Sequence, residues 1–551
     1  MKLHEANMDK YHRYGPIMKE EYQRGYPTVT IFHPSDIKEV FLREGGCPSR
    51  PVLDYVIKHR KSDPSRYPNV GLANMEGSEW QDLRKRLASR LLDINERHIS
   101  TQNKVSSRLV NYIKSLLPAT NSDTQDRKIQ SAKIETTDTR YNQINQYIYD
   151  NNNNSINDRF PDEIDRNHSN VHSSGIVENI QEVFYRFSME SIMNLCINQE
   201  LGCLQASGGD SLNQISGDGE LIFQAAMNFF EAQHKLYYGS DLWKYFDTKS
   251  YRQLRDNQDA IHDITSKYID VALLHLKKKR EAKKHKREEH ESLLETLYCT
   301  NEFNDLEIKS TIVDFVGGGI YTVANTLTMV LFLLASNPRV QEQLYQEICQ
   351  VFGHDDSGDN DITVDMKKLE QLKFLKLCLK ESYRLLPTIP GVARKLNRDM
   401  ILSNYLVPKD TLVFCNSMVT CRLPQYFPNP DEYDPSRWDE DGDKKLRKRH
   451  RDNDLAFCLL QFGHGVRKCI GHNFAELEIY VALAKLIRHF KISTINGEDA
   501  KSLDLCYKFI VVPEKPVTLE FTPRNQGRKD LQERHQNQEL VVEDRRISVA
   551  C

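Results

Sequence analysis

The chain has 551 residues, with 75 Lys or Arg against 78 Asp or Glu, and therefore carries a net charge of −3 at neutral pH. Only 39% of the residues are hydrophobic and the mean hydropathy is −0.61, which excludes a protein with many membrane spans and places part of the chain outside any core. The slightly acidic balance excludes a strongly basic nucleic-acid binder, so no nucleic-acid partner is expected.

The N-terminal residues MKLHEANMDKYHRYG contain neither an apolar leader nor a small-residue cleavage site. The twelve cysteines are scattered without the C-x-x-C pairs of a metal finger. These two features predict a reduced intracellular chain rather than a disulfide scaffold. Two interpretations of the missing leader stay open, namely a cytosolic protein or a chain whose natural N-terminus lies further upstream.

The first third of the chain shows one strand pattern and one long helical pattern. Polar residues alternate with β-branched or aromatic residues over 22–32, which predicts a strand. Residues 76–117 have helical periodicity, with Trp80, Leu83 and Leu87 on one apolar stripe. We therefore expect this stripe to face the core.

An insertion without core-forming residues follows. Between 119 and 174 there are ten Asn and few aliphatic residues, so the segment cannot bury enough apolar surface to offset its ordering entropy and is predicted to be disordered. Helical patterning resumes over 178–203 and continues through most of 220–300. Within it, Lys277 to Arg287 form a basic run, which is either solvated or a contact with a membrane surface or partner.

The second half of the chain begins with an uncharged stretch at 315–338, long enough to span a bilayer. Its first half is rich in Gly, Thr and Asn, which favours a long buried helix whose polar half lines a cavity. A second helix is expected over 365–386, and strands and turns over 392–420. A charged loop insertion is predicted at 439–454, and a loose polar tail at 523–551.

The segment 462–471, Phe-Gly-His-Gly-Val-Arg-Lys-Cys-Ile-Gly, precedes an apolar-periodic helix. Gly463 and Gly465 allow tight turns and close approach to a flat ligand. Cys469 lies at the N-terminal end of the helix, where amide N–H groups favour a thiolate, and Arg467 can neutralise a ligand carboxylate. The pattern therefore favours haem-thiolate binding over a glycine loop with an ordinary buried cysteine.

This segment resembles the F-G-x-G-x-R-x-C-x-G haem-binding signature of the cytochrome P450 superfamily at every specified position. The resemblance implies a mainly α fold with a small β region, formed by one catalytic domain over 1–522. It also implies haem b as cofactor, with Cys469 as the axial iron ligand. The resemblance gives these residues as further haem contacts: Phe462, Gly463, Gly465, Arg467, Trp80, Arg84 and Arg394.

A second motif of the family is an E-x-x-R pair on a helix. Glu381 and Arg384 in KESYRLLP match it, and Arg437 in YDPSRW matches the arginine that completes a buried Glu-Arg-Arg network in this family. By itself, an E-x-x-R pair is more often an i,i+3 surface pair. The resemblance therefore implies a structural network for these three residues.

Within the superfamily the chain resembles the mitochondrial-type group, for example in AELE at 475–478. Lys376 and Lys380 match two lysines that in this group dock an acidic ferredoxin (adrenodoxin-like), which an NADPH-dependent reductase supplies with electrons. The alternative is that both lysines are simply solvated on an amphipathic helix. His472 and Asn473 stand where the group usually has two arginines, which removes positive charge from the expected docking surface. The group resemblance implies the matrix face of the mitochondrial inner membrane, with a peripheral membrane contact.

Residues 318–326, GGIYTVANT, resemble the oxygen-activating helix of the family. The resemblance assigns three catalytic positions: Gly319 would leave room for oxygen, Thr322 would hydrogen-bond it, and Tyr321 replaces the usual neighbouring acid. A phenol with a pKa near ~10 is a poor proton shuttle compared with a carboxylate.

The resemblance implies a haem-thiolate monooxygenase that hydroxylates a lipophilic, sterol- or steroid-like substrate with O2 and electrons from a ferredoxin. Two alternatives remain. One is a haem-thiolate isomerase or peroxygenase that needs no external electrons, motivated by Tyr321. The other is a truncated, non-catalytic haem binder, motivated by the short N-terminus.

Overall fold

The computed structural model describes residues 3–21, 27–91, 94–117, 175–205, 217–281, 292–353, 361–439, 448, 454–499 and 501–524. The predicted insertion at 119–174, most of the predicted charged loop at 439–454 and nearly all of the predicted tail lie outside the described residues.

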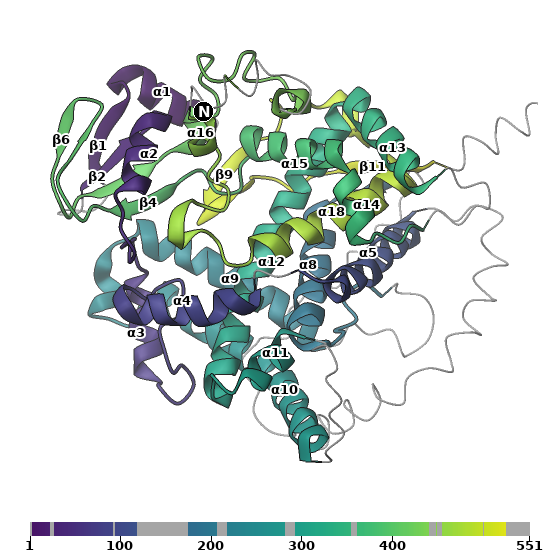
Figure 1. Ribbon diagram of the computed structural model, residues 1–551, viewed down its shortest axis with the longest axis horizontal. Coiled ribbons are helices and arrows are strands. Elements are labelled where there is room, and N and C mark those ends of the chain that lie inside the picture. The colour runs from purple at the N-terminus through teal and green to yellow at the C-terminus, as the bar shows by residue number, and fades with distance from the viewer. Residues whose placement is uncertain are drawn as a thin grey trace, which may run out of the picture.

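The described chain is mainly helical, as expected, and Figure 1 shows helices filling most of the molecule with a small sheet at one side. The longer helices are α1 (Leu3–Tyr14), α2 (Pro34–Leu42), α3 (Asp54–Ser62), α4 (Gly77–Leu91), α5 (Glu96–Leu116), α8 (Ile180–Ile197), α9 (Gly217–Tyr238), α10 (Lys249–Glu281), α11 (Leu293–Thr300), α12 (Asp305–Ser336), α13 (Pro338–Phe352), α14 (Met366–Gln371), α15 (Lys373–Leu385), α16 (Ser417–Thr420) and α18 (His472–His489). The single-turn helices are η3 (Asp241–Lys244), η4 (Pro435–Trp438), η5 (Leu455–Phe457), η6 (Gly465–Arg467) and η7 (Ile495–Gly497).

The strands form four small sheets. They are β1 (Ile17–Glu21), β2 (Pro27–Ile31), β3 (Ile176–Val177), β4 (Val392–Lys395), β5 (Met400–Leu402), β6 (Tyr405–Val407), β7 (Leu412–Cys415), β8 (Phe490–Thr494), β9 (Leu505–Lys508), β10 (Ile510–Pro513) and β11 (Leu519–Pro523). The largest sheet has the order β1-β2-β7-β4, in which β2 and β7 are parallel and the other pairs antiparallel. The remaining sheets are β5-β6, β9-β10 and β3-β11-β8.

The long helical pattern at 76–117 is two helices rather than one. A new helix begins because Asn95 is an N-cap: its side chain accepts from the backbone N–H of Arg97 and His98, while its own N–H donates to His98 Nδ1 at 3.1 Å. Residues 365–386 are likewise two helices, α14 and α15, which meet at Leu372. In both cases the apolar period continued across a local break that periodicity alone does not detect.

The long buried helix expected at 315–338 is confirmed as α12. It begins earlier, at Asp305, because Asn304 and Glu307 form a capping box. Among the described helices it alone is long and apolar enough to cross a membrane, but 83% of its most apolar window is buried inside the protein. It runs through the centre of the molecule, and α8, α10 and α15 pack against it (Figure 1).

Candidate active site

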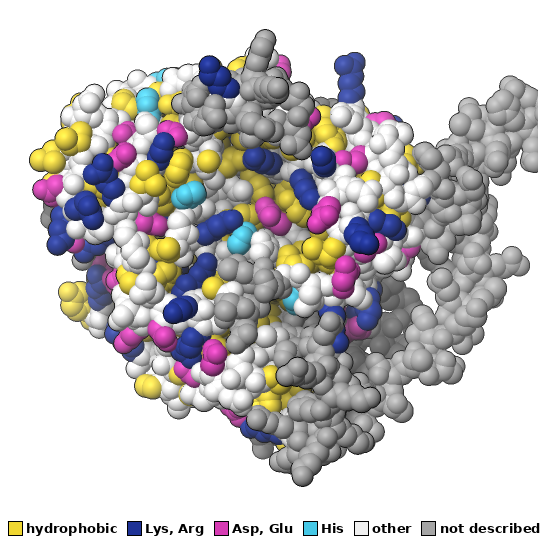
Figure 2. Space-filling view, in the orientation of Figure 1, with side chains coloured by type: hydrophobic (Ala, Val, Ile, Leu, Met, Phe, Trp, Pro, Cys, Tyr) yellow, Lys and Arg dark blue, Asp and Glu magenta, His cyan; other side chains and the backbone are white. Residues whose placement is uncertain are grey.

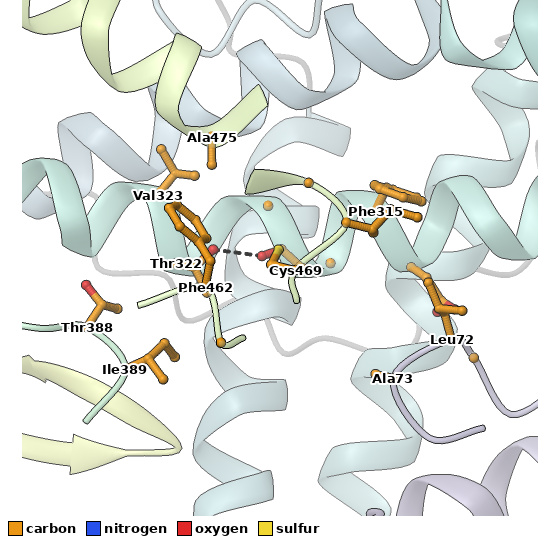
Figure 3. Close-up of a pocket in the computed structure, with 18 of the residues that line it drawn as sticks. Leu72, Ala73, Phe315, Thr322, Val323, Thr388, Ile389, Phe462, Cys469 and Ala475 are labelled. Carbon is orange, nitrogen blue, oxygen red and sulfur yellow. Dashed lines mark hydrogen bonds between the residues drawn. The ribbon is translucent and has the colours of Figure 1, made fainter. Parts of the chain in front are cut away.

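One large cavity of about 1,070 Å³ lies between α12 and the loop that leads into α18. Its walls also include residues from α3, α4, α9 and the segment before β4. Figure 3 shows Thr322 of α12 and Cys469 of the loop facing the same space. Phe315 and Leu72 lie on one side of Cys469, and Thr388 and Ile389 lie on the other (Figure 3).

The loop around Cys469 has a shape that its glycines permit. Gly463 and Gly465 have φ values of +72° and +70°, in the left-handed region, and a Cβ on Gly465 would overlap the carboxylate of Glu44. The backbone N–H of Cys469 donates to the Phe462 carbonyl at 2.8 Å, which closes the loop. The thiol is exposed to the cavity a short distance before the first turn of α18.

The electrostatic surroundings of the Cys469 thiol are mixed. Enclosure by protein raises the pKa of this thiol, while the Gly471 N–H and the guanidinium groups of Arg84 and Arg50 act to lower it. A thiolate at this position therefore needs a further cation to offset its desolvation, and a bound metal ion would supply one.

Arg467 and Trp80 form one wall of the cavity. The Arg467 guanidinium stacks over the Trp80 ring at 3.6 Å, and its Nε and Nη1 each donate at 3.0 Å to the carbonyls of Pro48 and Met75. Its Nη2 is buried and has no hydrogen-bond partner among the described residues. Arg84 lies nearby and donates to the Lys468 carbonyl at 2.7 Å. One guanidinium donor is thus left over at the cavity wall.

Arg394 lines the same cavity but is engaged by protein groups. Its Nε donates to Glu44 at 2.6 Å, and its Nη2 to the His464 carbonyl at 3.1 Å. A further arginine, Arg50, also lines the cavity and was not identified from the sequence. Burial and then the repulsion between neighbouring guanidinium groups lower the pKa of Arg50 and Arg467 to about 10. Because the neighbouring guanidinium groups repel one another, a ligand with two negative charges would stabilise this wall of the cavity.

These observations together fit a flat, dianionic ligand that carries a metal ion. The glycines keep side chains away from the loop, a cysteine is exposed to the cavity, and an arginine donor is unpartnered. Haem b has this combination of plane, carboxylates and iron, so the residues present fit the expected cofactor.

The positions on α12 differ in part from those the resemblance assigns. The Thr322 hydroxyl reaches the cavity and donates to the Gly318 carbonyl at 2.9 Å, which matches its expected place. A Cβ on Gly319, however, would face the Ile192 side chain at 3.1 Å, whereas one on Gly318 would meet no atom within 4 Å. Both glycines line the cavity, and the wider open space is at Gly318, so the role of Gly319 in leaving room for oxygen stays a prediction.

Tyr321 is not among the residues that line the cavity, and its place beside Thr322 in the catalytic set stays a prediction. Its ring stacks on Phe230 at 4.3 Å and on Tyr185 at 5.6 Å, and it is 3% exposed. One residue along a helix is a rotation of about 100°, which turns position 321 toward α8 and α9. Burial raises the pKa of Tyr321 far above neutrality, so the phenol stays protonated.

The structure brings Glu381, Arg384 and Arg437 together in a buried network. The Glu381 carboxylate accepts from Arg384 Nε and Nη2 at 2.9 and 2.8 Å and from Arg437 Nε at 2.8 Å. Glu381 and Arg384 are fully buried. Trp438 Nε1 also donates to Glu381 at 2.8 Å, a partner missed from the sequence although it directly follows Arg437. This network fixes α15 against the segment that carries η4.

Lys376 and Lys380 share one face of α15 and are half-buried. The Lys380 ammonium lies 4.5 Å from the Trp438 ring, which holds its stem against the protein. Burial raises the pKa of Glu476 in α18, and the charges of Lys468 and Lys376 oppose this rise. Glu476 is therefore an acid close to the expected docking lysines, which sequence reasoning did not include. His472, the departure from the group pattern, donates from Nδ1 to the Cys469 carbonyl at 2.8 Å.

Comparison with known proteins agrees with this site. The Cytochrome P450 family model matches residues 1–128 and 139–521. The chain is 29% identical to ecdysone 20-monooxygenase of Drosophila melanogaster over 95% of the chain and 84% of that protein. It is 25% identical to the mitochondrial cholesterol side-chain cleavage enzyme of Bos taurus over 95% of the chain and 85% of that protein.

A third relative is cytochrome P450 302a1, mitochondrial, of Drosophila melanogaster, with 24% identity over 96% of the chain and 90% of that protein. Several relatives are thus named as mitochondrial. Family membership also supplies the cofactor, because the iron of this family's haem is bound by a cysteine thiolate. Since the match covers most of the chain and the site agrees with it, this chain belongs to the cytochrome P450 family and is a haem-thiolate monooxygenase of mitochondrial type.

Proposed function

We propose that this enzyme hydroxylates a sterol- or steroid-like lipophile inside mitochondria, with electrons from an adrenodoxin-like ferredoxin and its NADPH-dependent reductase. The observation that carries the proposal is the single cavity in which Cys469 and Thr322 face the same space. The names of the relatives support the substrate class, since two of them act on ecdysone and on cholesterol.

Bound haem supplies the activation of O2 and the insertion of one oxygen atom into a C–H bond. Cys469 is the iron ligand, and its loop, closed by the hydrogen bond to Phe462, holds the sulfur in place. Arg467, whose Nη2 has no partner among the described residues, would hold one haem carboxylate, and Arg84 and Arg50 add positive charge on the same wall. Trp80 packs under the Arg467 guanidinium and orients it.

In this proposal Thr322 takes part in proton transfer although the neighbouring position 321 is a tyrosine and not an acid. The Thr322 hydroxyl donates to the Gly318 carbonyl, so its oxygen is directed as an acceptor toward the open space at Gly318. Thr326 and Thr388 share a hydrogen bond of 2.8 Å one turn further along the wall. In this proposal water within the cavity delivers the protons that Tyr321, turned away from it, does not.

The ferredoxin docks on the face that carries Lys376 and Lys380. Figure 2 shows Lys and Arg side chains gathered over the central part of the face where α4, α15 and α18 lie, with acidic side chains between them. An acidic partner is steered toward such a surface by Coulomb attraction. Glu476 weakens this attraction locally, so we expect docking that is less sensitive to salt than two isolated lysines suggest.

A peripheral contact with the matrix face of the inner membrane is also proposed. Leu242, Tyr245 and Phe246, between α9 and α10, are 53%, 80% and 66% exposed. Exposed large apolar side chains in one short segment favour insertion into a lipid surface. Flotation with cardiolipin-containing vesicles tests this contact, and loss of binding on replacing the three residues by Ser is the expected result.

The test of the ligand assignment is the reduced carbon-monoxide spectrum of Cys469→Ala. We expect loss of the thiolate-type spectrum, while Cys47→Ala, which changes an exposed cysteine, keeps it. A thiolate-type spectrum that survives in Cys469→Ala would contradict the assignment.

The test of the reaction is product formation from sterols with NADPH, adrenodoxin and adrenodoxin reductase. We expect turnover that requires all three components and a higher KM for the ferredoxin in Lys376→Glu with unchanged substrate binding. Turnover that proceeds with peroxide and ignores NADPH would contradict the proposal and favour a peroxygenase.

A further inference from the structure

A charged pair interrupts the apolar wall at one end of the active-site cavity. Arg60 of α3 and Asp314 of α12 both line the cavity, and Arg60 Nη2 donates to Asp314 Oδ1. Val56, Leu72 and Phe315 are apolar residues of the same wall. Burying two charges in such surroundings costs free energy unless each finds partners, so this pair needs an explanation.

The pair lies far along α12 from the reacting end. Asp314 precedes Thr322 by eight residues, and at about 1.5 Å per residue this is about 12 Å along the helix axis. Positions 314, 318 and 322 follow at intervals of four and therefore lie along one face of the helix. The cavity thus has an oxidising end near Thr322 and Cys469 and a polar end near Asp314.

Arg60 is held firmly at this polar end. With its amide oxygen turned toward the guanidinium, Gln258 accepts from Arg60 Nη2 at 3.1 Å and from Nε at 2.7 Å. The guanidinium also lies 5.1 Å from the Tyr67 ring centroid. Its side chain is 9% exposed, so its position is fixed by protein contacts rather than by solvent.

Hydrogen-bonding capacity nevertheless remains on both members of the pair. Arg60 Nη1 is buried and, within the described part of the chain, has no hydrogen-bond partner. Asp314 is 23% exposed, and among the described residues its Oδ2 receives no hydrogen bond. Arg60 Nη1 has almost no accessible surface and is closed off from the cavity, whereas the Asp314 Oδ2 acceptor is left over at the cavity wall.

The backbone around Gly71 packs closely against the pair. Gly71 has a φ of +84°, and a Cβ there would lie 2.6 Å from Arg60 Nη1 and 2.7 Å from Asp314 Oδ2. Any larger residue would displace both charged groups. The glycine thus lets the chain pass close to the pair without displacing it and helps to fix the position of both groups.

We propose that Arg60 and Asp314 form a subsite that binds a hydroxyl group at the far end of an elongated lipophilic substrate. The hydroxyl donates to Asp314 Oδ2, the carboxylate oxygen that the hydrogen bond from Arg60 Nη2 leaves free. A hydroxyl fits better than a charged group, because the pair repels a carboxylate through Asp314 and an ammonium through Arg60. The inference rests on the proposed function and deepens it, since it makes a hydroxylated sterol the substrate class.

Spin-state titration of the resting ferric enzyme with two sterols tests the proposal. The probes are cholesterol and its analogue that lacks the 3-hydroxyl group. We expect the wild type to bind cholesterol about tenfold or more tightly than the analogue, since a hydrogen bond to a charged group is lost with the hydroxyl. Equal affinity for the two sterols, or no spectral shift with either, would overturn the proposal.

The double variant Arg60→Met with Asp314→Leu distinguishes binding of the substrate hydroxyl from a purely structural contact between α3 and α12. We expect cholesterol to lose its advantage while the deoxy analogue binds as before, because apolar replacements of similar volume preserve packing. If the double variant does not fold, Asp314→Asn replaces it, with the same direction and a smaller loss. Retained preference for cholesterol, or an equal loss for both sterols, would overturn the proposal.

The matched control is Arg66→Met with Asp263→Leu, a neighbouring ion pair of 3.1 Å whose residues do not line the cavity. It should leave both affinities unchanged. The titration needs no electron donor, so failure of ferredoxin-supported turnover bears only on the proposed function. Normal ferredoxin-supported turnover together with equal affinity for the two sterols would contradict the subsite alone and leave the proposed function intact.

Discussion

Replacing Glu381 by Gln removes the one negative charge at the centre of the buried arginine network. Its Oε1 accepts three hydrogen bonds, from Arg384, Arg437 and the Asp434 backbone, and its Oε2 accepts two, from Arg384 and Trp438. In Glu381→Gln two guanidinium groups stay buried without a counterion, and the new amide N–H2 faces donors. Breaking a buried pair in this way costs about 3–5 kcal/mol.

The expected shift in melting temperature follows from the size of the chain. Unfolding entropy is about 2.1 cal/mol/K per residue, so for 551 residues a loss of 1 kcal/mol lowers Tm by about 1 °C. Glu381→Gln should therefore melt about 3–5 °C below the wild type. The network joins α15 to the segment around η4, beside the cysteine loop, so the haem content of purified protein should fall as well.

Circular dichroism and the Soret band, recorded in the same thermal scan, measure both effects. Glu370→Gln is the matched control, because Glu370 is exposed on the preceding helix and such changes stay within about 0.5 kcal/mol. Equal Tm and equal haem content in the two variants would refute the reasoning, since it would mean that the buried charges need no counterion.

Three further predictions concern other parts of the site. Gly465→Ala should lower haem retention, measured by the haem-to-protein ratio, because the residue has a φ of +70° and its Cβ would overlap Glu44. The control is Gly497→Ala, which is also at positive φ but in open space. Equal haem retention in the two variants would contradict this prediction. Burial raises the pKa of Glu478 to about 8, whereas the carboxyl group of an unfolded chain has a pKa of ~4.3. Between these two pH values the native state holds a proton that the unfolded chain has released, so the free energy of unfolding falls as the pH rises. Glu478→Gln should therefore gain stability over the wild type in urea melts at pH 8.5 and lose that gain near pH 5; a gain independent of pH would contradict the assignment. Tyr321→Phe should keep the wild-type coupling of NADPH use to product, since the phenol faces away from the cavity, and a marked drop in coupling would show that its hydroxyl takes part.

The cysteine loop could be predicted from the sequence because its geometry is local. Left-handed backbone at Gly463 and Gly465, the closure of the loop onto Phe462 and the start of α18 all depend on residues within a few positions of one another. The pairing of Glu381 with Arg384 is local too, since residues three apart on a helix are neighbours. Spacing along the chain was enough to identify both.

The direction of side chains around α12 could not be predicted in the same way. The motif matched Gly319, Tyr321 and Thr322 in sequence, but the helix twist and the packing of α8 and α9 decided that Gly319 and Thr322 line the cavity and Tyr321 does not. The sequence alone does not say which side of this helix faces aromatic neighbours. Either orientation of Tyr321, toward the cavity or toward the aromatic side chains, is therefore compatible with it. The structure turned Tyr321 into the aromatic stack and left Thr322 at the cavity.

By itself, the sequence determined the helical class, the cysteine loop and the local network pair, because each depends on contacts between residues close in the chain. The tertiary structure alone decided the partners of two arginines: Arg394 with Glu44, 350 residues apart, and Arg60 with Asp314, 254 residues apart. No spacing rule connects residues so distant, since their meeting depends on how every intervening helix packs. The polar end of the cavity is therefore a property of the fold and not of any motif.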